Sequence, residues 1–200
     1  MTAATLTREI AGAGVGVGRL IRYDPRWPEG FNPTADGFLR SFLGPLLALP
    51  FYLIVAVVFA AVPAAGGAVA PGPDAQVLWA AAVSQALNAL AFPVIVGALA
   101  RPLGFAEGYA GFVVVVNWTS LFLNMAAAAA SLLTLVGGAG PALFSVAWLG
   151  LFAVSLFVIW RAARETLSPD IPVALLMVVL SVGIGVASDH LAGWLFGVPA

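Results

Sequence analysis

Long apolar stretches without a single charged residue alternate along this chain with shorter polar stretches. Residues 41–63 and 75–100 are two such stretches, and each exceeds the roughly 20 residues that an α-helix needs to cross the hydrocarbon core of a bilayer. A third stretch, 108–160, holds 53 uncharged residues, which at about 1.5 Å of rise per residue is too long for one crossing. Its GGAGP segment, 137–141, predicts a break, because Gly and Pro interrupt helices. We therefore predict five membrane spans, at about 41–63, 75–100, 109–136, 142–160 and 172–195.

The composition indicates the same class of protein. Hydrophobic residues make up 62% of the 200-residue chain and charged residues 8%, whereas a soluble domain is about 25% charged. Backbone polar groups inside a bilayer must find their partners within the protein, so spans of this length are expected to be helices. We predict an all-α, polytopic transmembrane helix bundle over 41–200, preceded by an N-terminal interfacial amphipathic segment over 1–40.

The basic residues indicate how the bundle is threaded through the membrane. All eight are arginines, and the five-span arrangement puts them on one side: Arg8, Arg19, Arg22, Arg26, Arg40, Arg101, Arg161 and Arg164. Because basic residues favour the cytoplasmic side, we expect the N-terminus in the cytoplasm and the C-terminus outside. The exclusive use of arginine and the abundance of Ala, Gly and Val are typical of a GC-rich bacterial genome. We therefore expect the protein in a bacterial inner membrane.

The first 40 residues are of mixed polarity, and we expect them to lie at the membrane surface and not to serve as a signal peptide. Apolar residues recur there near helical spacing, at Leu6, Ile10, Val17 and Leu20. The arginines expected to contact anionic lipid head groups are Arg8, Arg19, Arg22 and Arg26. The glycines at 12, 14, 16 and 18 lack the spacing of a dinucleotide-binding loop, so we expect them only to weaken the helix. Thr34 is predicted to cap the first membrane helix.

Several amides lie inside the predicted spans, where a polar side chain is costly unless it has a partner or a purpose. Gln85 and Asn88 share one face of the second span, and Asn117, Ser120 and Asn124 share one stripe of the third. Asn88 and Asn124 both fall near the middle of the bilayer, so a direct hydrogen bond that holds the two helices together is one interpretation. A polar path or a small-molecule site at this depth is the other.

The fifth span carries an isolated acidic residue. Small or polar residues recur there at every fourth position, at Ser181, Gly185, Asp189 and Gly193, which predicts a face that packs on another helix. His190 lies about 100° away around the helix, so it is not expected to form an acid–base pair with Asp189. The two residues are candidates for handling a proton or a cation. The alternative is a carboxylate bonded to a neighbouring helix or loop, although no arginine is expected on that side.

The rest of the sequence offers little chemistry. The chain has no cysteine and one histidine, which removes thiol nucleophiles and argues against a metal site. No Ser-His-Asp arrangement and no pair of carboxylates suited to acid–base catalysis is visible. We therefore expect no enzymatic activity, no catalytic residues, and no metal or cofactor. The net charge of −1 does not point to a nucleic-acid partner.

Three features resemble the Yip family of small five-span membrane proteins, which has bacterial members. They are the segment YDPRWPEGF ahead of the first span, the stretch LARPLGFAEGYAGFVVVVNW, which looks like that family's glycine-containing cytoplasmic turn entering the third span, and the five-span plan itself. The segment LGPLL, 43–47, lacks the acidic and tyrosine positions of the motif in eukaryotic members. Those members are linked to Rab GTPases and membrane shaping, and a bacterium has no Rab system. The resemblance implies a non-enzymatic integral membrane protein.

The small-residue helix faces and the amphipathic N-terminus favour a non-enzymatic inner-membrane protein that acts as an interaction, scaffold or membrane-organising subunit. Its expected partners are membrane lipids and either another membrane protein or a second copy of the chain. The alternative is a small oligomeric transporter or channel that uses the amides at mid-membrane and Asp189. An inverted repeat, which many transporters contain, is not visible in the sequence.

Overall fold

The computed structural model describes residues 3–61 and 74–198, and this part of the chain is α-helical without a β-strand. The α-helices are α1 (Ala3–Ile21), α2 (Ala35–Ser41), α3 (Leu43–Ala61), α4 (Ala75–Ala100), α5 (Tyr109–Ser131), α6 (Gly140–Thr166) and α7 (Ile171–Phe196). Short 3₁₀ helices are η1 (Trp27–Gly30), η2 (Leu132–Leu135) and η3 (Gly137–Ala139). Five segments of the described chain are long and apolar enough to cross a membrane. The predicted all-α bundle is therefore confirmed.

The helix bounds follow the predicted spans with few differences. α4 occupies 75–100 as predicted. The helix α6 extends past the predicted end of the fourth span at 160. The polar residues after Trp160 belong to the same helix, which ends at Thr166. The α-helix α5 ends at Ser131, and η2 continues the third span-length segment to Leu135, close to the predicted end at 136. The predicted end of the first span, residue 63, lies outside the described residues.

The start of the first span is built as the sequence predicts, although in two pieces. The Thr34 hydroxyl accepts a hydrogen bond from the Gly37 N–H at 3.2 Å and so caps α2. Asp36 lies in the first turn of α2, where its negative charge interacts favourably with the helix dipole. Phe42 then separates α2 from α3. Together the two helices form one span-length segment.

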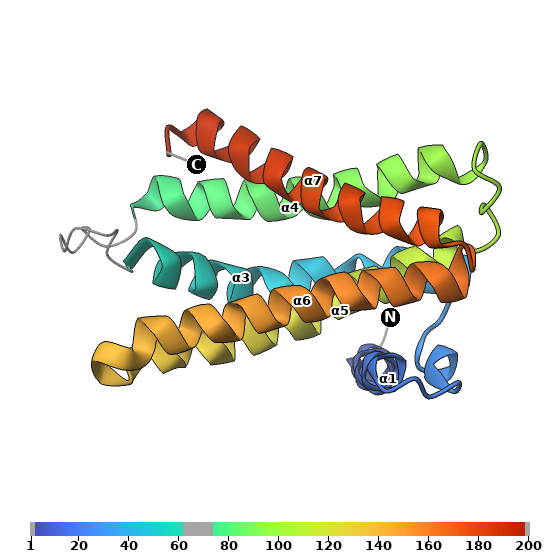
Figure 1. Cartoon of the computed structure of the whole chain (residues 1–200), viewed down its shortest axis with the longest axis horizontal. Helices are drawn as coiled ribbons and strands as arrows, with labels where there is room; N and C mark the ends of the chain where they lie inside the picture. The colour runs from blue at the N-terminus through green and yellow to red at the C-terminus, as the bar shows by residue number, and fades with distance from the viewer. Residues whose placement is uncertain (1–2, 62–73, 199–200) are drawn as a thin grey trace.

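Consecutive long helices run in opposite directions and pack as two groups. Figure 1 shows α4 and α7 side by side, with α3, α5 and α6 on the other side of the bundle. The two groups meet where α3 contacts α4 and where α6 contacts α7. The helix α5 is the most deeply buried of the five, and its residues 112–115 are almost completely shielded. This central helix carries the predicted stripe of amides into the interior.

All eight arginines belong to segments at one end of the bundle, where α3, α5 and α7 begin. We call this the arginine end and the other the opposite end. In Figure 1, α1 is seen nearly end-on beside the long helices, so it runs across their direction. It packs against α5 and α6. A helix that lies along a membrane surface has this orientation relative to the spans.

Two glycines of α1 allow close packing. A side chain at Gly14 would press on the ring of Phe122 in α5, and a side chain at Gly16 would collide with the ring of Phe31. The same helix buries Ala13, Val17 and Leu20. At these two positions the expectation that glycine only weakens the helix is wrong, because the absence of a side chain lets α1 approach its neighbours closely.

Candidate functional site

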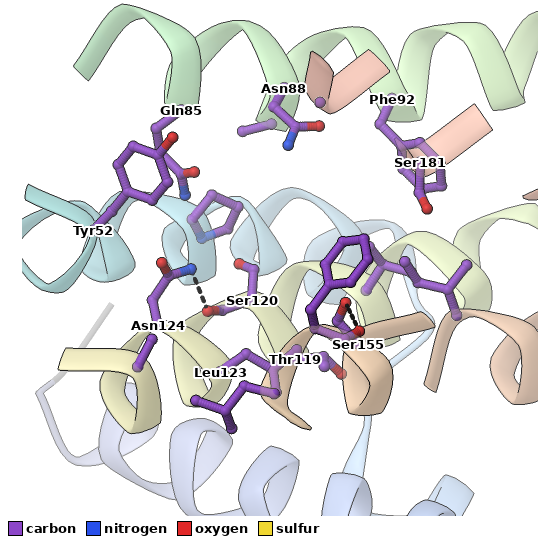
Figure 2. Close-up of a pocket in the computed structure, with 18 of the residues that line it drawn as sticks. Tyr52, Gln85, Asn88, Phe92, Thr119, Ser120, Leu123, Asn124, Ser155 and Ser181 are labelled. Atoms are coloured by element: carbon purple, nitrogen blue, oxygen red, sulfur yellow. Dashed lines mark hydrogen bonds between the residues drawn. The ribbon is translucent and has the colours of Figure 1, made fainter. Parts of the chain in front are cut away.

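A cavity of about 540 Å³ lies between the two groups of helices. Its walls are mainly apolar, but each of the five long helices contributes at least one polar side chain. These include Tyr52 of α3, Gln85 and Asn88 of α4, Asn124 of α5, Ser155 of α6 and Asp189 of α7. Figure 2 shows side chains from α4 and α5 pointing into the same space from opposite walls.

Helical spacing brings the predicted amides together. Gln85 and Asn88 are separated by three positions and project from one face of α4 (Figure 2). Asn117, Ser120 and Asn124 form the facing stripe on α5, and all three line the cavity. The structure thus brings both of the stripes seen in the sequence to one site.

The α5 stripe satisfies its own hydrogen bonds. The Asn124 amide donates to the Ser120 carbonyl at 2.8 Å, and the Ser120 hydroxyl donates to the Asn117 carbonyl at 2.7 Å. The Asn117 amide donates to the Ser41 hydroxyl at 2.9 Å, which joins α5 to the end of α2. Within the described residues the expected Asn88–Asn124 hydrogen bond is not formed, because Asn124 uses the backbone of its own helix.

Other polar groups of the cavity have no hydrogen-bond partner within the described chain. They are the side-chain amides of Gln85 and Asn88 and the hydroxyl of Thr119, whose residue is only 4% exposed. Of these groups only the Thr119 hydroxyl is buried, and a buried polar group left without a partner costs about 1–3 kcal/mol. These three side chains come from two helices that face each other across the cavity. The partly exposed amides of Gln85 and Asn88 are therefore available to a polar molecule that enters the cavity.

Asp189 joins three helices near the opposite end. Its Oδ1 atom accepts hydrogen bonds from the Ser84 hydroxyl of α4 and, at 3.4 Å, from the Tyr52 hydroxyl of α3. The predicted small-residue face of α7 also reaches the cavity, with Ser181 and Gly185 in its lining. The carboxylate is thus bonded to neighbouring helices while it borders the cavity.

His190 takes no part in this cluster. Its Nδ1 atom lies 3.0 Å from the Val186 carbonyl of its own helix, and the residue does not line the cavity. The residues that line the cavity include no Arg, Lys or His. Among the described residues that line the cavity, Asp189 is the one carboxylate, and it has no basic partner there.

Sequence reasoning missed Tyr52 and Ser84 as partners of Asp189. A signal existed for Tyr52, since it is the one phenol inside the first span. Ser84 directly precedes Gln85, and a single serine in an apolar helix does not indicate a partner on another helix. Neither pairing follows from periodicity within one helix, because it depends on how three helices are positioned relative to one another.

The arginines expected to contact lipid divide into two classes. Arg19 and Arg26 form ion pairs inside the N-terminal segment: Arg19 with Glu29 at 2.9 Å and Arg26 with Asp24 at 2.9 Å. The side-chain hydrogen bond from Arg26 lowers the pKa of Asp24 to about 2.

The other two, Arg8 and Arg22, are exposed and form no ion pair within the described residues. They are the arginines of this segment that remain available for lipid phosphates. The N-terminal segment is fastened to the bundle by different contacts. Arg40 pairs with Glu9 at 3.0 Å, and the Arg161 guanidinium lies 3.6 Å above the centre of the Tyr23 ring.

No group of three or more His, Cys, Asp or Glu side chains suited to a metal ion occurs in the described parts of the chain. Searches of protein-family models, of curated proteins and of solved structures found no match to this chain. The cavity and its polar side chains are thus the features that bear on function.

Proposed function

We propose that this protein binds a small polar solute inside its helix bundle and carries it across the membrane. The observation that supports this proposal best is the cavity of about 540 Å³ between all five long helices, in which the side chains of Gln85, Asn88 and Thr119 have no partner among the described residues. Ligand sites are typically concave, mainly apolar and about 300–1,000 Å³ in volume, with a few polar groups that orient the ligand.

The lining restricts the chemistry of the solute. Amides and hydroxyls hydrogen-bond to polar groups of either kind, as donors or as acceptors. The cavity contains one carboxylate and no basic side chain, so it disfavours anions. Aliphatic and aromatic walls complete the surface. The expected solute is a small organic molecule, neutral or cationic, with an apolar part.

The two ends of the cavity differ in a way that suits transport. Towards the arginine end it is closed by the hydrophobic core, where the Phe92 and Phe112 ring centres lie 6.0 Å apart and Val158 and Met177 are buried. Away from that end, α6 and α7 diverge in Figure 1, and Phe152, Val182 and Val186 border the cavity while remaining exposed. The cavity is thus closed towards the arginine end and open between α6 and α7, near the middle of the two helices.

The two helix groups suggest how access would alternate. The pair α4 and α7 and the group α3, α5 and α6 form opposite walls of the cavity. A small rotation of one group against the other would separate Phe92 from Phe112 and close the far side, which is how rigid-body motions move a site from one face of a membrane to the other. We propose that the protein lies in a bacterial inner membrane with its N-terminus in the cytoplasm, so that the end of the cavity away from the arginines would face the outside.

A cysteine-labelling experiment tests whether the cavity admits water and solute. The chain contains no cysteine, so a single introduced thiol reports on one position. Ser155→Cys places a thiol in the cavity lining, and Ala153→Cys places one on the exposed surface of the same helix, outside the lining. A charged thiol reagent should modify Ser155→Cys in membranes and leave Ala153→Cys, which faces lipid, unmodified. Equal protection of both variants would contradict the proposal.

The scaffold function favoured by the sequence remains the second candidate. Its support is the N-terminal segment, which presents the unpaired Arg8 and Arg22 beside the membrane-spanning bundle. It requires no solute in the cavity. A sealed cavity in the labelling experiment, together with a partner protein that co-purifies in fixed ratio, would favour this function over transport.

A further inference from the structure

The Asp189 carboxylate is held in a fixed position by two donors. The Ser84 and Tyr52 hydroxyls both donate hydrogen bonds to its Oδ1 atom. These two residues precede Asp189 by 105 and 137 positions in the sequence. Its Oδ2 atom takes part in no hydrogen bond or ion pair within the described chain. One oxygen of a positioned carboxylate is thus left for another ligand.

No charge in the surrounding structure balances this carboxylate. All ion pairs of the described residues involve arginines of the arginine end, and none includes Asp189. The groups that face it are the Tyr52 phenol from α3 and the Ser84 hydroxyl from α4, while His190 on α7 binds its own helix backbone. Asp189 is an exposed residue at the edge of a mainly apolar cavity, and a carboxylate beside apolar walls is stabilised when a cation or a proton accompanies it.

Aromatic rings line the same cavity as Asp189. Phe59 and Trp148 line the same cavity, with ring centres 5.1 Å apart in an edge-to-face arrangement. Both belong to the half of the bundle toward the opposite end, where Asp189 also lies. The faces of aromatic rings attract ammonium groups, and tryptophan does so most strongly. A carboxylate and aromatic rings that line one cavity are both groups that attract a monovalent cation.

We propose that Asp189 binds a monovalent cation at the opposite end of the cavity, either an inorganic ion or the protonated amine of the transported solute. This proposal rests on the proposed function, since it assumes that a solute reaches the cavity. Ser84 and Tyr52 act as positioning residues that orient the carboxylate. The unpaired amides of Gln85 and Asn88 then contact the uncharged remainder of the solute, or a neutral co-solute.

Chemical protection of Asp189 tests the proposal on the full chain in lipid nanodiscs. A hydrophobic carbodiimide modifies carboxyl groups in membrane proteins, and mass spectrometry of the digested protein locates the modification. Labelling is measured in equal concentrations of sodium, potassium, methylammonium, tetramethylammonium and N-methylglucamine chlorides. A cation present at ten times its Kd leaves about one site in eleven free, so labelling of Asp189 should fall about tenfold. Asp170, at the start of the same helix and outside the cavity, should be labelled equally in every salt.

The pattern of protection identifies the source of the cation. Protection by sodium or potassium assigns an inorganic ion, and protection by methylammonium or tetramethylammonium alone assigns an organic amine. Labelling of Asp189 that is the same in all five salts overturns the proposal. If that occurs while Ser155→Cys is still modified by the charged reagent, transport stands and only the cation site falls.

A second measurement does not depend on the carbodiimide. Asp189→Asn keeps an oxygen that accepts the Ser84 and Tyr52 hydrogen bonds and removes the charge. The protecting cation should raise the melting temperature of the wild type and of the matched Asp170→Asn variant, but not that of Asp189→Asn. A shift that persists in Asp189→Asn would show that the cation binds elsewhere, which also overturns the proposal.

Discussion

The Ser84 hydroxyl on α4 donates a hydrogen bond to the Asp189 carboxylate on α7 and so joins two helices that are far apart in sequence. The Tyr52 hydroxyl reaches the same carboxylate oxygen from α3, at the longer distance of 3.4 Å. Two hydroxyls on one oxygen position the carboxylate at the edge of the cavity. The remainder of the site has fewer bonds, because Gln85 and Asn88 are unpaired in the described structure.

The two hydroxyls should differ in their coupling to Asp189. In double-mutant cycles with Asp189→Ala, we expect Ser84→Ala to show the larger coupling energy, because its hydrogen bond is the shorter of the two. Hydrogen bonds between membrane helices average about 0.6 kcal/mol and reach about 1.7 kcal/mol at most, and we expect a value in this range. Tyr52→Phe should show a smaller coupling, because its hydrogen bond is long. The free energy of unfolding in mixed detergent micelles measures both. Zero coupling for Ser84 would show that the hydrogen bond does not form in the membrane.

Gly44 sets the distance between α3 and α5. A side chain there would collide with the Asn117 carbonyl, whereas one at Gly183 on α7 would meet open space. We expect Gly44→Leu to lower the free energy of unfolding by about 1–3 kcal/mol, as overpacking generally does. Gly183→Leu, the matched control, should leave it within about 0.5 kcal/mol. Equal effects from the two substitutions would mean that the two helices do not approach closely at Gly44.

The unpaired arginines of the N-terminal segment should bind anionic lipid. Replacing Arg8 and Arg22 with glutamine should weaken binding by about 1 kcal/mol for each charge lost, since neither guanidinium has an ion-pair partner in the described structure. Arg26→Gln should have less effect, because Arg26 pairs with Asp24. Native mass spectrometry of nanodiscs with increasing anionic lipid content measures how many such lipids stay bound. An Arg26→Gln loss as large as that of Arg8→Gln would contradict this division.

The Asp24–Arg26 pair should persist to unusually low pH. The hydrogen bond from Arg26 lowers the pKa of Asp24 to about 2 from its ordinary 3.8. A carboxyl whose pKa falls on folding stabilises the folded state above its unfolded pKa and loses that contribution as the pH falls through its folded pKa. We therefore expect hydrogen-exchange protection of the Arg26 amide, which donates to Asp24, to remain at pH 3 and to disappear near pH 2.

A matched variant identifies the source of that protection. Asp24→Asn should reduce protection of the Arg26 amide at neutral pH and should make it independent of pH between about 2 and 4, because the titrating group is gone. If the wild type lost this protection near pH 4, the Arg26 hydrogen bond would not lower the pKa in solution.

Much of the fold could be predicted from the order of apolar and polar residues along the chain. Hydropathy located the five spans, and α4 has the predicted bounds of 75–100. Helical period also identified the amide faces of α4 and α5 that line the cavity. These features are properties of single helices. Their prediction requires no knowledge of how the helices are positioned relative to one another.

The pairings in the site depend on that positioning and escaped prediction. Asn124 bonds to the Ser120 carbonyl and not to Asn88, and Asp189 bonds to Ser84 and Tyr52. The Asp189 pairings depend on how three helices are positioned, which apolar periodicity does not encode, whereas Asn124 bonds to the backbone of its own helix four residues earlier. The resemblance to the Yip family, the orientation in the membrane and the bacterial origin stay predictions.

Access to the centre of the cavity from each side of the membrane is the most direct test of transport. Asn124→Cys places the sole thiol at mid-cavity, and a charged, membrane-impermeant reagent is added separately to either face of sealed vesicles of known orientation. We expect modification from both faces, fast from the side of the opposite end and slower from the arginine end, where Phe92 and Phe112 close the cavity. Modification from one face alone, or from neither, would contradict transport through this cavity.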